Sequence, residues 1–168
     1  MAREIWSAGR RNGNVMKLHT LISTAFLLTL VACGKGNDKA NADHSERDRV
    51  SNPNAKVVLE LMQGFNDHDT DAMKELWADD VTWFEIVDGN SRAITSSAAQ
   101  LYTELVTYFE AYPDVKSELE KISVNGNFVT AIETPVWEQD GVSKSQSSVV
   151  VYEIVDQKVK RFWYFPPQ

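Results

Sequence analysis

Residues 65–85 read FNDHDTDAMKELWADDVTWFE, and the elements on either side are arranged around this stretch. It begins at the end of an amphipathic helix, turns at Asp69-Thr70, and continues as a short helix from Asp71 to Trp77. A break at Ala78-Asp79-Asp80 then precedes a strand. Polar residues at both turns are typical helix caps, and the apolar residues of the short helix recur at helical spacing. The stretch therefore predicts two consecutive helices followed by a strand.

The flanking sequence predicts one more helix and a run of strands. The helix before the stretch has apolar residues at i, i+3, i+4 and i+7, ending at Phe65. A long helix is expected from a cap at Ser96 or Ser97 to a stop at Pro113. Helices followed by strands with turn signals between them indicate an α+β domain. The expected strands are Val81–Val87, Val115–Val124, Phe128–Trp137, Val142–Val155 and Lys158–Phe165.

The order of helix, Asn-x-x-Asp turn, helix, Ala-Asp-Asp and strand resembles the nuclear transport factor 2-like superfamily. Within it, the chain is most similar to SnoaL-like and ketosteroid isomerase-like domains, over about Ala55 to Phe165. The resemblance implies an α+β cone, in which a strongly curved antiparallel sheet wraps around three N-terminal helices. The open end of such a cone is usually a pocket. Because unrelated functions share a fold, the resemblance leaves the reaction open.

The amino terminus reads as a targeting segment. Residues 1–32 are expected to be a signal peptide, with a basic start near Met16 and an apolar run over Leu21–Leu30. The start codon is either Met1 or Met16, and residues before Met16 are then a spurious extension. The run ends in LVAC, which resembles a bacterial lipobox and implies acylation of Cys33, the only cysteine. The alternative is a buried cysteine after a core helix.

The expected organisation is therefore a lipid-anchored domain of the bacterial cell envelope. Residues 33–54 are rich in Gly, Asn, Asp, Lys and Ser, and such a composition predicts a flexible tether to a domain at 55–168. Gly34 after the cysteine implies, by resemblance to enterobacterial lipoproteins, export to the outer membrane. The net charge of −7 argues against nucleic acid as a partner, since phosphate binding needs a basic face.

Glu85 is the sharpest candidate for a catalytic residue. It lies on the first expected strand beside Phe84 and Ile86, and the resemblance places it where ketosteroid isomerases carry their proton-shuttling aspartate. Apolar surroundings are expected to raise its pKa, which suits a general base. The alternative is that Glu85 points to solvent or pairs with Arg92.

The other polar groups of that isomerase site are not expected here. The resemblance places the substrate-binding tyrosine at Leu61 and the partnering acid near Val151, and neither side chain can donate a hydrogen bond to an oxyanion. Glu133, inside an apolar strand, is a second candidate pocket acid. His68 is interpreted as a turn residue, since without ligand partners at the right spacing it predicts no metal site.

Five aromatic residues are candidates to line the pocket, although such residues also build cores. They are Trp83, Tyr102, Trp137, Tyr152 and Trp163. No phosphate-binding glycine loop or other cofactor motif is found. The first hypothesis is a domain that binds a small apolar or ring-bearing molecule in its cone. The alternatives are an isomerase- or hydrolase-like enzyme with Glu85 as base, and a homodimeric interaction module, so enzymatic activity stays open.

Overall fold

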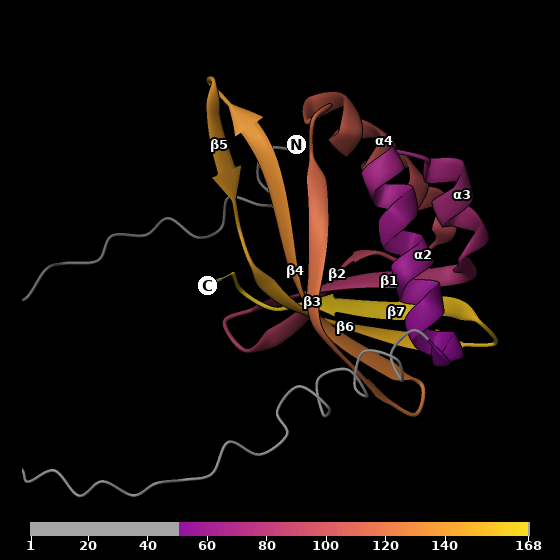
Figure 1. Ribbon diagram of the computed structural model, residues 1–168. Helices are drawn as coiled ribbons and strands as arrows, with labels where there is room; N and C mark the ends of the chain where they lie inside the picture. The colour runs from indigo at the N-terminus through magenta and orange to yellow at the C-terminus, as the bar shows by residue number, and fades with distance from the viewer. Residues whose placement is uncertain (1–50, 168) are drawn as a thin grey trace, which may run out of the picture.

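The computed structural model describes residues 51–167, which form three helices packed on one curved, seven-stranded sheet (Figure 1). The helices are α2 (Pro53–Asp67), α3 (Thr70–Glu75) and α4 (Ala98–Ala111). The strands are β1 (Trp77–Val87), β2 (Asn90–Thr95), β3 (Lys116–Asn125), β4 (Phe128–Gln139), β5 (Val142–Ser145), β6 (Ser148–Val155) and β7 (Lys158–Tyr164).

The predicted caps around the α2–α3 turn are confirmed. α2 ends at Asp67 and is capped by His68, which has a left-handed backbone with φ of 54° and whose backbone N–H donates to carbonyls of the last helical turn. Asp69 then caps α3, because its side chain accepts a hydrogen bond of 2.9 Å from the backbone N–H of Ala72. His68 itself is a turn residue whose Nε2 lies 2.8 Å from the carbonyl oxygen of Val115.

The boundary after α3 differs from the prediction. The short helix ends at Glu75 instead of Trp77, and Ala78-Asp79-Asp80 lies within β1 instead of forming a break. The cause is pairing with a distant strand: Trp77 is opposite Val159 of β7, whose N–H donates to the Leu76 carbonyl at 2.8 Å. A local pattern cannot reveal that partner, since it lies more than 80 residues away in sequence.

Asn66 joins the end of α2 to the start of β3. Its side-chain N–H donates to the backbone carbonyl of Ser117 at 2.9 Å, and its side-chain oxygen Oδ1 accepts from the backbone N–H of Ser117 at 2.7 Å. Asn66→Ala removes both bonds, and we expect the free energy of unfolding to fall by roughly 1–2 kcal/mol. Urea denaturation would measure this loss. Asn90→Ala is the control, because the Asn90 side chain bonds only within an exposed turn, and an equal loss there would contradict the role of Asn66.

The strands form one open sheet in the order β2-β1-β7-β6-β4-β3, with β5 paired to β4. The predicted α+β cone is confirmed. The β1–β7 pair is parallel and the remaining pairs are antiparallel, so the sheet is mixed. The strand expected over Val142–Val155 is two strands, since β5 and β6 pair with different parts of β4. β2, which was not predicted, pairs with β1 across the turn at Asp88–Asn90.

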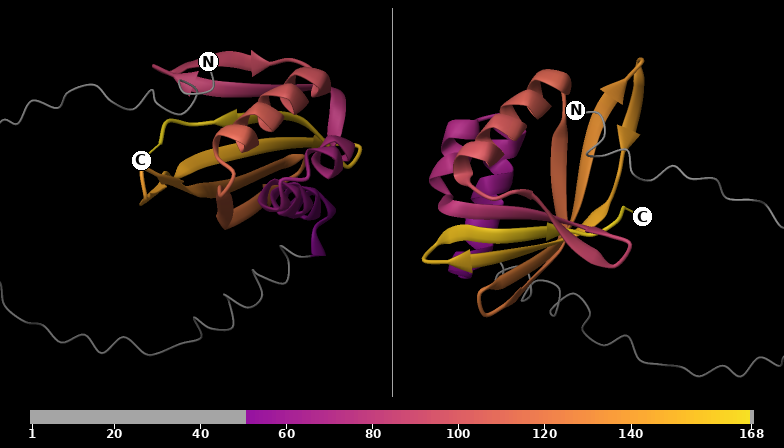
Figure 2. Two further views of the ribbon diagram at one scale, coloured as in Figure 1. Left: turned by 90° about the horizontal axis from the view of Figure 1, so that it is seen from above. Right: turned by 180° about the vertical axis from the view of Figure 1, so that it is seen from behind.

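All three helices lie on one side of the sheet (Figure 2). β1, β7 and β6 run beneath them, whereas β3, β4 and β5 rise away, so the sheet is bent around the helices (Figure 1). Alternation along the strands places one set of side chains in the core; in β6 these include Val150, Tyr152 and Ile154. The core therefore occupies the angle between the helices and the concave face of the sheet.

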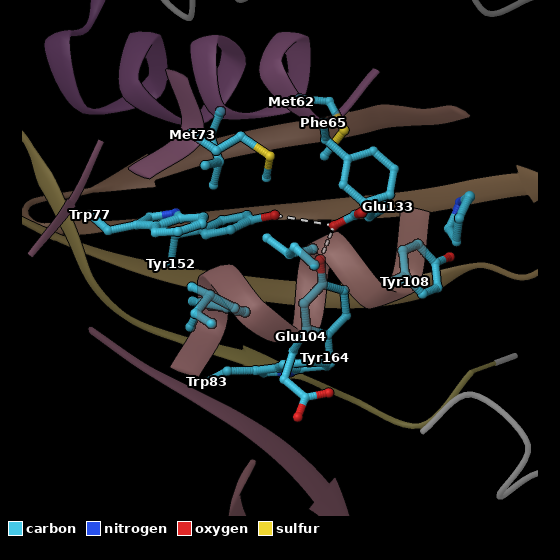
Figure 3. Close-up of a pocket in the computed structure, with 15 residues that line it drawn as sticks. Met62, Phe65, Met73, Trp77, Trp83, Glu104, Tyr108, Glu133, Tyr152 and Tyr164 are labelled. Carbon is cyan, nitrogen blue, oxygen red and sulfur yellow. Dashed lines mark hydrogen bonds between the residues drawn. The ribbon is translucent and has the colours of Figure 1, made fainter. Parts of the chain in front are cut away.

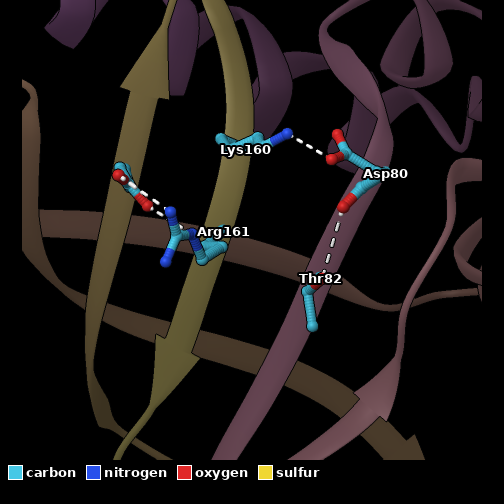
Figure 4. Close-up of polar contacts among 5 residues, drawn as sticks. Asp80, Thr82, Lys160 and Arg161 are labelled. Carbon is cyan, nitrogen blue, oxygen red and sulfur yellow. Dashed lines mark hydrogen bonds and ion pairs between the residues drawn. The ribbon is translucent and has the colours of Figure 1, made fainter.

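The outer face of the same strands carries ion pairs (Figure 4). Lys160 of β7 pairs with Asp80 of β1, and this hydrogen bond lowers the pKa of the Asp80 carboxyl. Arg161 Nε lies 2.7 Å from Glu153 Oε2 on β6. Thr82 Oγ1 donates to the Asp80 carbonyl at 3.3 Å. The two ion pairs hold β7 to its neighbours β1 and β6 on the side that the helices do not cover.

The predicted signal peptide and Cys33 lie outside the described residues, as does the predicted tether as far as residue 50. α2 begins at Pro53, so Pro53 and Asn54 belong to the folded domain instead of the tether. Within residues 51–167, no helix is both long enough and apolar enough to cross a membrane. The lipid anchor, the envelope location and the homodimer stay predictions.

Candidate functional site

A cavity of about 70 Å³ lies between the helices and the concave face of the sheet (Figure 3). All three helices and four of the strands contribute side chains to it. The lining residues are Leu61, Met62, Phe65, Met73, Trp77, Trp83, Leu101, Glu104, Leu105, Tyr108, Glu133, Pro135, Tyr152, Phe162 and Tyr164. The exposed residue Glu104 of α4 marks the side that faces solvent.

The walls of the cavity are mainly aromatic. Phe162 of β7 lies at the centre of one wall, with ring centroids 6.0 Å from Trp83, Tyr152 and Tyr164. The volume is several times that needed for a water molecule, which is roughly 10–15 Å³. A ring needs more room, and Met62 and Met73 can provide it because unbranched methionine side chains change rotamer easily.

Glu133 is the one acid that is buried in the cavity, with 2% of its surface exposed. Its Oε1 accepts a hydrogen bond of 3.1 Å from Ser117 Oγ, and its Oε2 accepts one of 3.1 Å from the Tyr152 hydroxyl. The Tyr164 hydroxyl also donates to Oε2. Figure 3 shows both tyrosine hydroxyls converging on the carboxylate. Strands β3, β4, β6 and β7 therefore build one polar cluster inside an apolar cavity.

Burial dominates the electrostatics of this cluster. It raises the pKa of Glu133, although the three hydroxyl donors act in the opposite direction by favouring the ionised carboxylate. Burial and the nearby Glu133 charge raise the pKa values of Tyr152 and Tyr164 well above their usual range, so both phenols stay protonated. The pKa of Tyr108 is raised by the same two causes. The cluster can therefore donate hydrogen bonds and can accept or release one proton at Glu133.

Two tryptophans of the cavity lining carry hydrogen-bond donors without a partner among the described residues. The indole nitrogens of Trp77 and Trp83 are buried and have no hydrogen-bond partner in the described part of the chain. A buried N–H without a partner is costly, and such groups are usually satisfied by water or a ligand. These two tryptophans therefore suit a bound molecule or water that carries an acceptor atom.

The structure brings only two of the five predicted aromatic residues to the cavity, Trp83 and Tyr152. Trp137 packs edge-on against Tyr112, with centroids 6.2 Å apart. Trp163 stacks on Phe84 at 5.6 Å. Tyr102 lies under the Lys74 ammonium at 5.6 Å, and a hydrogen bond with Asp71 raises its pKa. These three are absent from the lining, and their role in ligand binding stays a prediction.

Glu85 does not line the cavity. It pairs with Arg92 of β2, whose guanidinium nitrogen lies 2.7 Å from Glu85 Oε2. This contact is the alternative that the sequence left open. Leu61 does line the cavity, but Val151 lies on the opposite face of β6 from Tyr152. The role of Glu85 as a base stays a prediction, and the geometry favours Glu133 as the acid of this site.

No local sequence pattern marks Tyr108 and Tyr164 as members of the site. They come from α4 and β7, and only the folded chain brings them to Glu133. For Glu133 a signal existed: Val129, Ala131 and Glu133 alternate on one face of β4, and the first two are core residues. An acid that continues such a buried face is expected to be buried with it.

Comparisons with known proteins agree with this architecture. Residues 58–162 match the family described as the SnoaL-like domain. An uncharacterized cystatin fold protein from Novosphingobium aromaticivorans superposes with a TM-score of 0.60 at 17% identity, covering 67% of this chain and 97% of its own. A candidate SnoaL-like polyketide cyclase from Jannaschia sp. CCS1 gives a TM-score of 0.58 at 20% identity, covering 67% and 84%.

A third structure is that of TerC co-crystallized with polyporic acid. It has a TM-score of 0.56 at 18% identity and covers 67% of this chain and 90% of its own. At these identities the structural likeness shows the fold alone. No curated protein matches the chain.

Proposed function

Because this chain belongs to the SnoaL-like domain family, we propose that its cone binds a small, largely apolar, ring-bearing molecule. The observation that carries the proposal is the aromatic cavity with the Glu133 cluster at its wall. Small-molecule sites are concave and apolar, with a few polar groups that fix the orientation of the ligand. A structural relative crystallised with polyporic acid and another named as a cyclase support a small-molecule site in this fold.

The polar groups of the cavity suggest how the molecule is oriented. The indole N–H groups of Trp77 and Trp83 can donate to an oxygen, whereas Glu133 can accept from a donor. The apolar body of the ligand would lie against Phe162 and the methionines. A ring with one polar substituent matches a cavity that has a few polar groups among mainly apolar walls.

A bulky side chain at the solvent side of the cavity tests this proposal. Leu105 of α4 lines the cavity, so the indole of Leu105→Trp is expected to occupy it. Benzyl alcohol, used as the probe, should bind the unmodified protein with a dissociation constant on the order of 1 mM. In Leu105→Trp we expect the affinity to fall by about tenfold or more, as measured by isothermal titration calorimetry.

Val106→Trp is the matched control, because Val106 is the next residue on the same helix and is absent from the cavity lining. This variant should bind benzyl alcohol like the unmodified protein. Equal losses in both variants would point to a general effect on α4, and no binding to the unmodified protein would rule out the cavity as a site for such a ring.

An enzyme is the second candidate, and the raised pKa of the buried Glu133 favours it. A carboxylate with a raised pKa is a stronger base than an exposed one, and the hydroxyls of Tyr152 and Tyr164 hold it in place. In this alternative Glu133, instead of Glu85, is the base of an isomerase- or hydrolase-like reaction. Turnover that is lost in Glu133→Gln while the substrate still binds would distinguish the enzyme from a binding protein.

The location of the domain is a separate part of the proposal. We propose that Cys33 is acylated and tethers the domain to the bacterial envelope. The test is made in the producing cells, because the modification needs their machinery. Cys33→Ala is expected to move the protein from the membrane fraction to the soluble fraction, as followed by immunoblotting. Retention of Cys33→Ala in the membrane fraction would contradict the anchor.

A further inference from the structure

We propose that the molecule bound in this cavity is a small organic cation, in which a ring carries a protonated amine that pairs with Glu133. The inference rests on the proposed function, because it names the class of molecule that the same cavity takes. It goes further by assigning a charge to the ligand. The argument uses the charges of the lining, the direction of its hydrogen bonds and its aromatic walls.

The charged side chains of the cavity are all acidic. Among the described residues that line it, Glu104 and Glu133 are the only charged ones, and none is Lys, Arg or His. Glu104 is exposed at the solvent side, whereas Glu133 is buried. Buried charges in proteins are normally paired with an opposite charge. Here the lining supplies no partner cation for the ionised form of Glu133.

The hydrogen bonds around Glu133 nevertheless suit its ionised form. The hydroxyls of Ser117, Tyr152 and Tyr164 all donate to the carboxylate, and donors of this kind stabilise the negative charge. They supply dipoles but no net positive charge. A ligand ammonium group would complete the cluster, because it adds the missing charge and donates hydrogen bonds itself.

The aromatic walls favour a cation over a neutral molecule of the same shape. Any ring can pack on them, but a positive charge near the faces of tryptophan and tyrosine gains an additional electrostatic attraction. That attraction is stronger where water is excluded. Trp77, Trp83 and Phe162 are largely buried, so the cavity meets this condition.

Binding of a cation is coupled to the protonation of Glu133. Burial raises the pKa of this carboxyl, and because only the ionised form pairs with an ammonium, any molecule that holds the Glu133 proton must release it to bind the cation. The polar groups near Glu133 are Ser117 of β3, Tyr152 of β6, Tyr164 of β7 and Tyr108 of α4, and the one other charged residue of the lining is the exposed Glu104 of α4. None of them brings a positive charge. The affinity for a cation therefore rises with pH through the pKa of Glu133, whereas the affinity for a neutral ring does not.

Three probes of nearly the same size test the proposal on the purified protein: benzylamine, benzyl alcohol and benzoate. At neutral pH these are cationic, neutral and anionic. We expect benzylamine to bind at least about tenfold more tightly than benzyl alcohol, and benzoate to bind most weakly, as measured by calorimetry. In Glu133→Gln the ratio of the benzylamine and benzyl alcohol affinities should fall to about one.

Glu110→Gln is the control, because Glu110 is an exposed acid of α4 that does not line the cavity, and its removal should leave the ratio unchanged. Binding of benzyl alcohol with no preference for benzylamine would overturn the inference that the ligand is a cation, and it would leave the proposed function intact. A preference that persists in Glu133→Gln would place its origin in the overall negative charge and would also overturn the inference. If no probe binds, the proposed function itself fails.

Discussion

Phe162→Ala is expected to lower the free energy of unfolding by about 4 kcal/mol, the usual cost of truncating a buried phenylalanine. Phe162 is only 8% exposed, and its ring contacts those of Trp83, Tyr152 and Tyr164. These neighbours belong to three strands of one sheet, so they cannot move inward to fill the space. The lost contacts and the enlarged cavity both destabilise the fold. Urea denaturation followed by circular dichroism would measure the change.

Phe165→Ala is the matched control for this prediction. Phe165 lies just beyond the end of β7 and is 40% exposed, so its truncation should change the stability by roughly 0.5 kcal/mol or less. Losses of similar size in both variants would contradict the central place that Phe162 has in the core.

Tyr152→Phe is expected to cost about 2–3 kcal/mol at high pH, because it removes one hydrogen-bond donor from a buried carboxylate. Tyr152 is 2% exposed and its hydroxyl donates to Glu133 at 3.1 Å. Since that bond favours the ionised form, its loss raises the pKa of Glu133 further. Chemical denaturation at a series of pH values would measure both effects.

The sign of the pH dependence follows from this shift. The folded protein holds the Glu133 proton at pH values where the unfolded chain has released it, so stability falls as the pH rises from the ordinary value of 4.5 through the raised pKa. In Tyr152→Phe the fall should continue to higher pH. The difference between the two proteins is therefore smallest near pH 4.5 and largest above the pKa of Glu133 in the variant.

Tyr112→Phe makes the same substitution outside the cavity, where Tyr112 packs between Tyr108 and Trp137. Its effect should be small, and it should not depend on the ionisation of Glu133. A loss in Tyr152→Phe that is the same at every pH would show that the hydroxyl does not stabilise the carboxylate.

Local signals in the sequence were sufficient to identify the three helices and their N-terminal caps, but not the end of α3. Asp69 caps α3 and Ser97 caps α4, as predicted, because a capping side chain bonds to backbone N–H groups only a few residues away. The start of β1 was not predictable in this way. Trp77 leaves the helix because it pairs with Val159, and that contact depends on the whole fold.

Local sequence patterns were also insufficient to identify which acid lines the cavity. Glu85 follows Val81 and Trp83 on one face of β1, as Glu133 follows Val129 and Ala131 on β4, so this alternation marks both acids and does not distinguish them. The sheet order does: Glu85 lies beside the edge strand β2 and finds Arg92 there, whereas Glu133 lies on β4 between β3 and β6. Burial of an acid is decided by what covers its strand, which is a property of the folded chain.

The most direct test of the account is a map of where a ring binds, made by nuclear magnetic resonance of the labelled protein during titration with benzyl alcohol. We expect the largest chemical-shift changes at cavity residues, including Leu101, Tyr152 and Tyr164. Phe84 and Trp163, which stack on each other away from the cavity, should change little. Changes centred on Phe84 and Trp163, with the cavity residues unaffected, would contradict the proposal that the ring binds in the cavity.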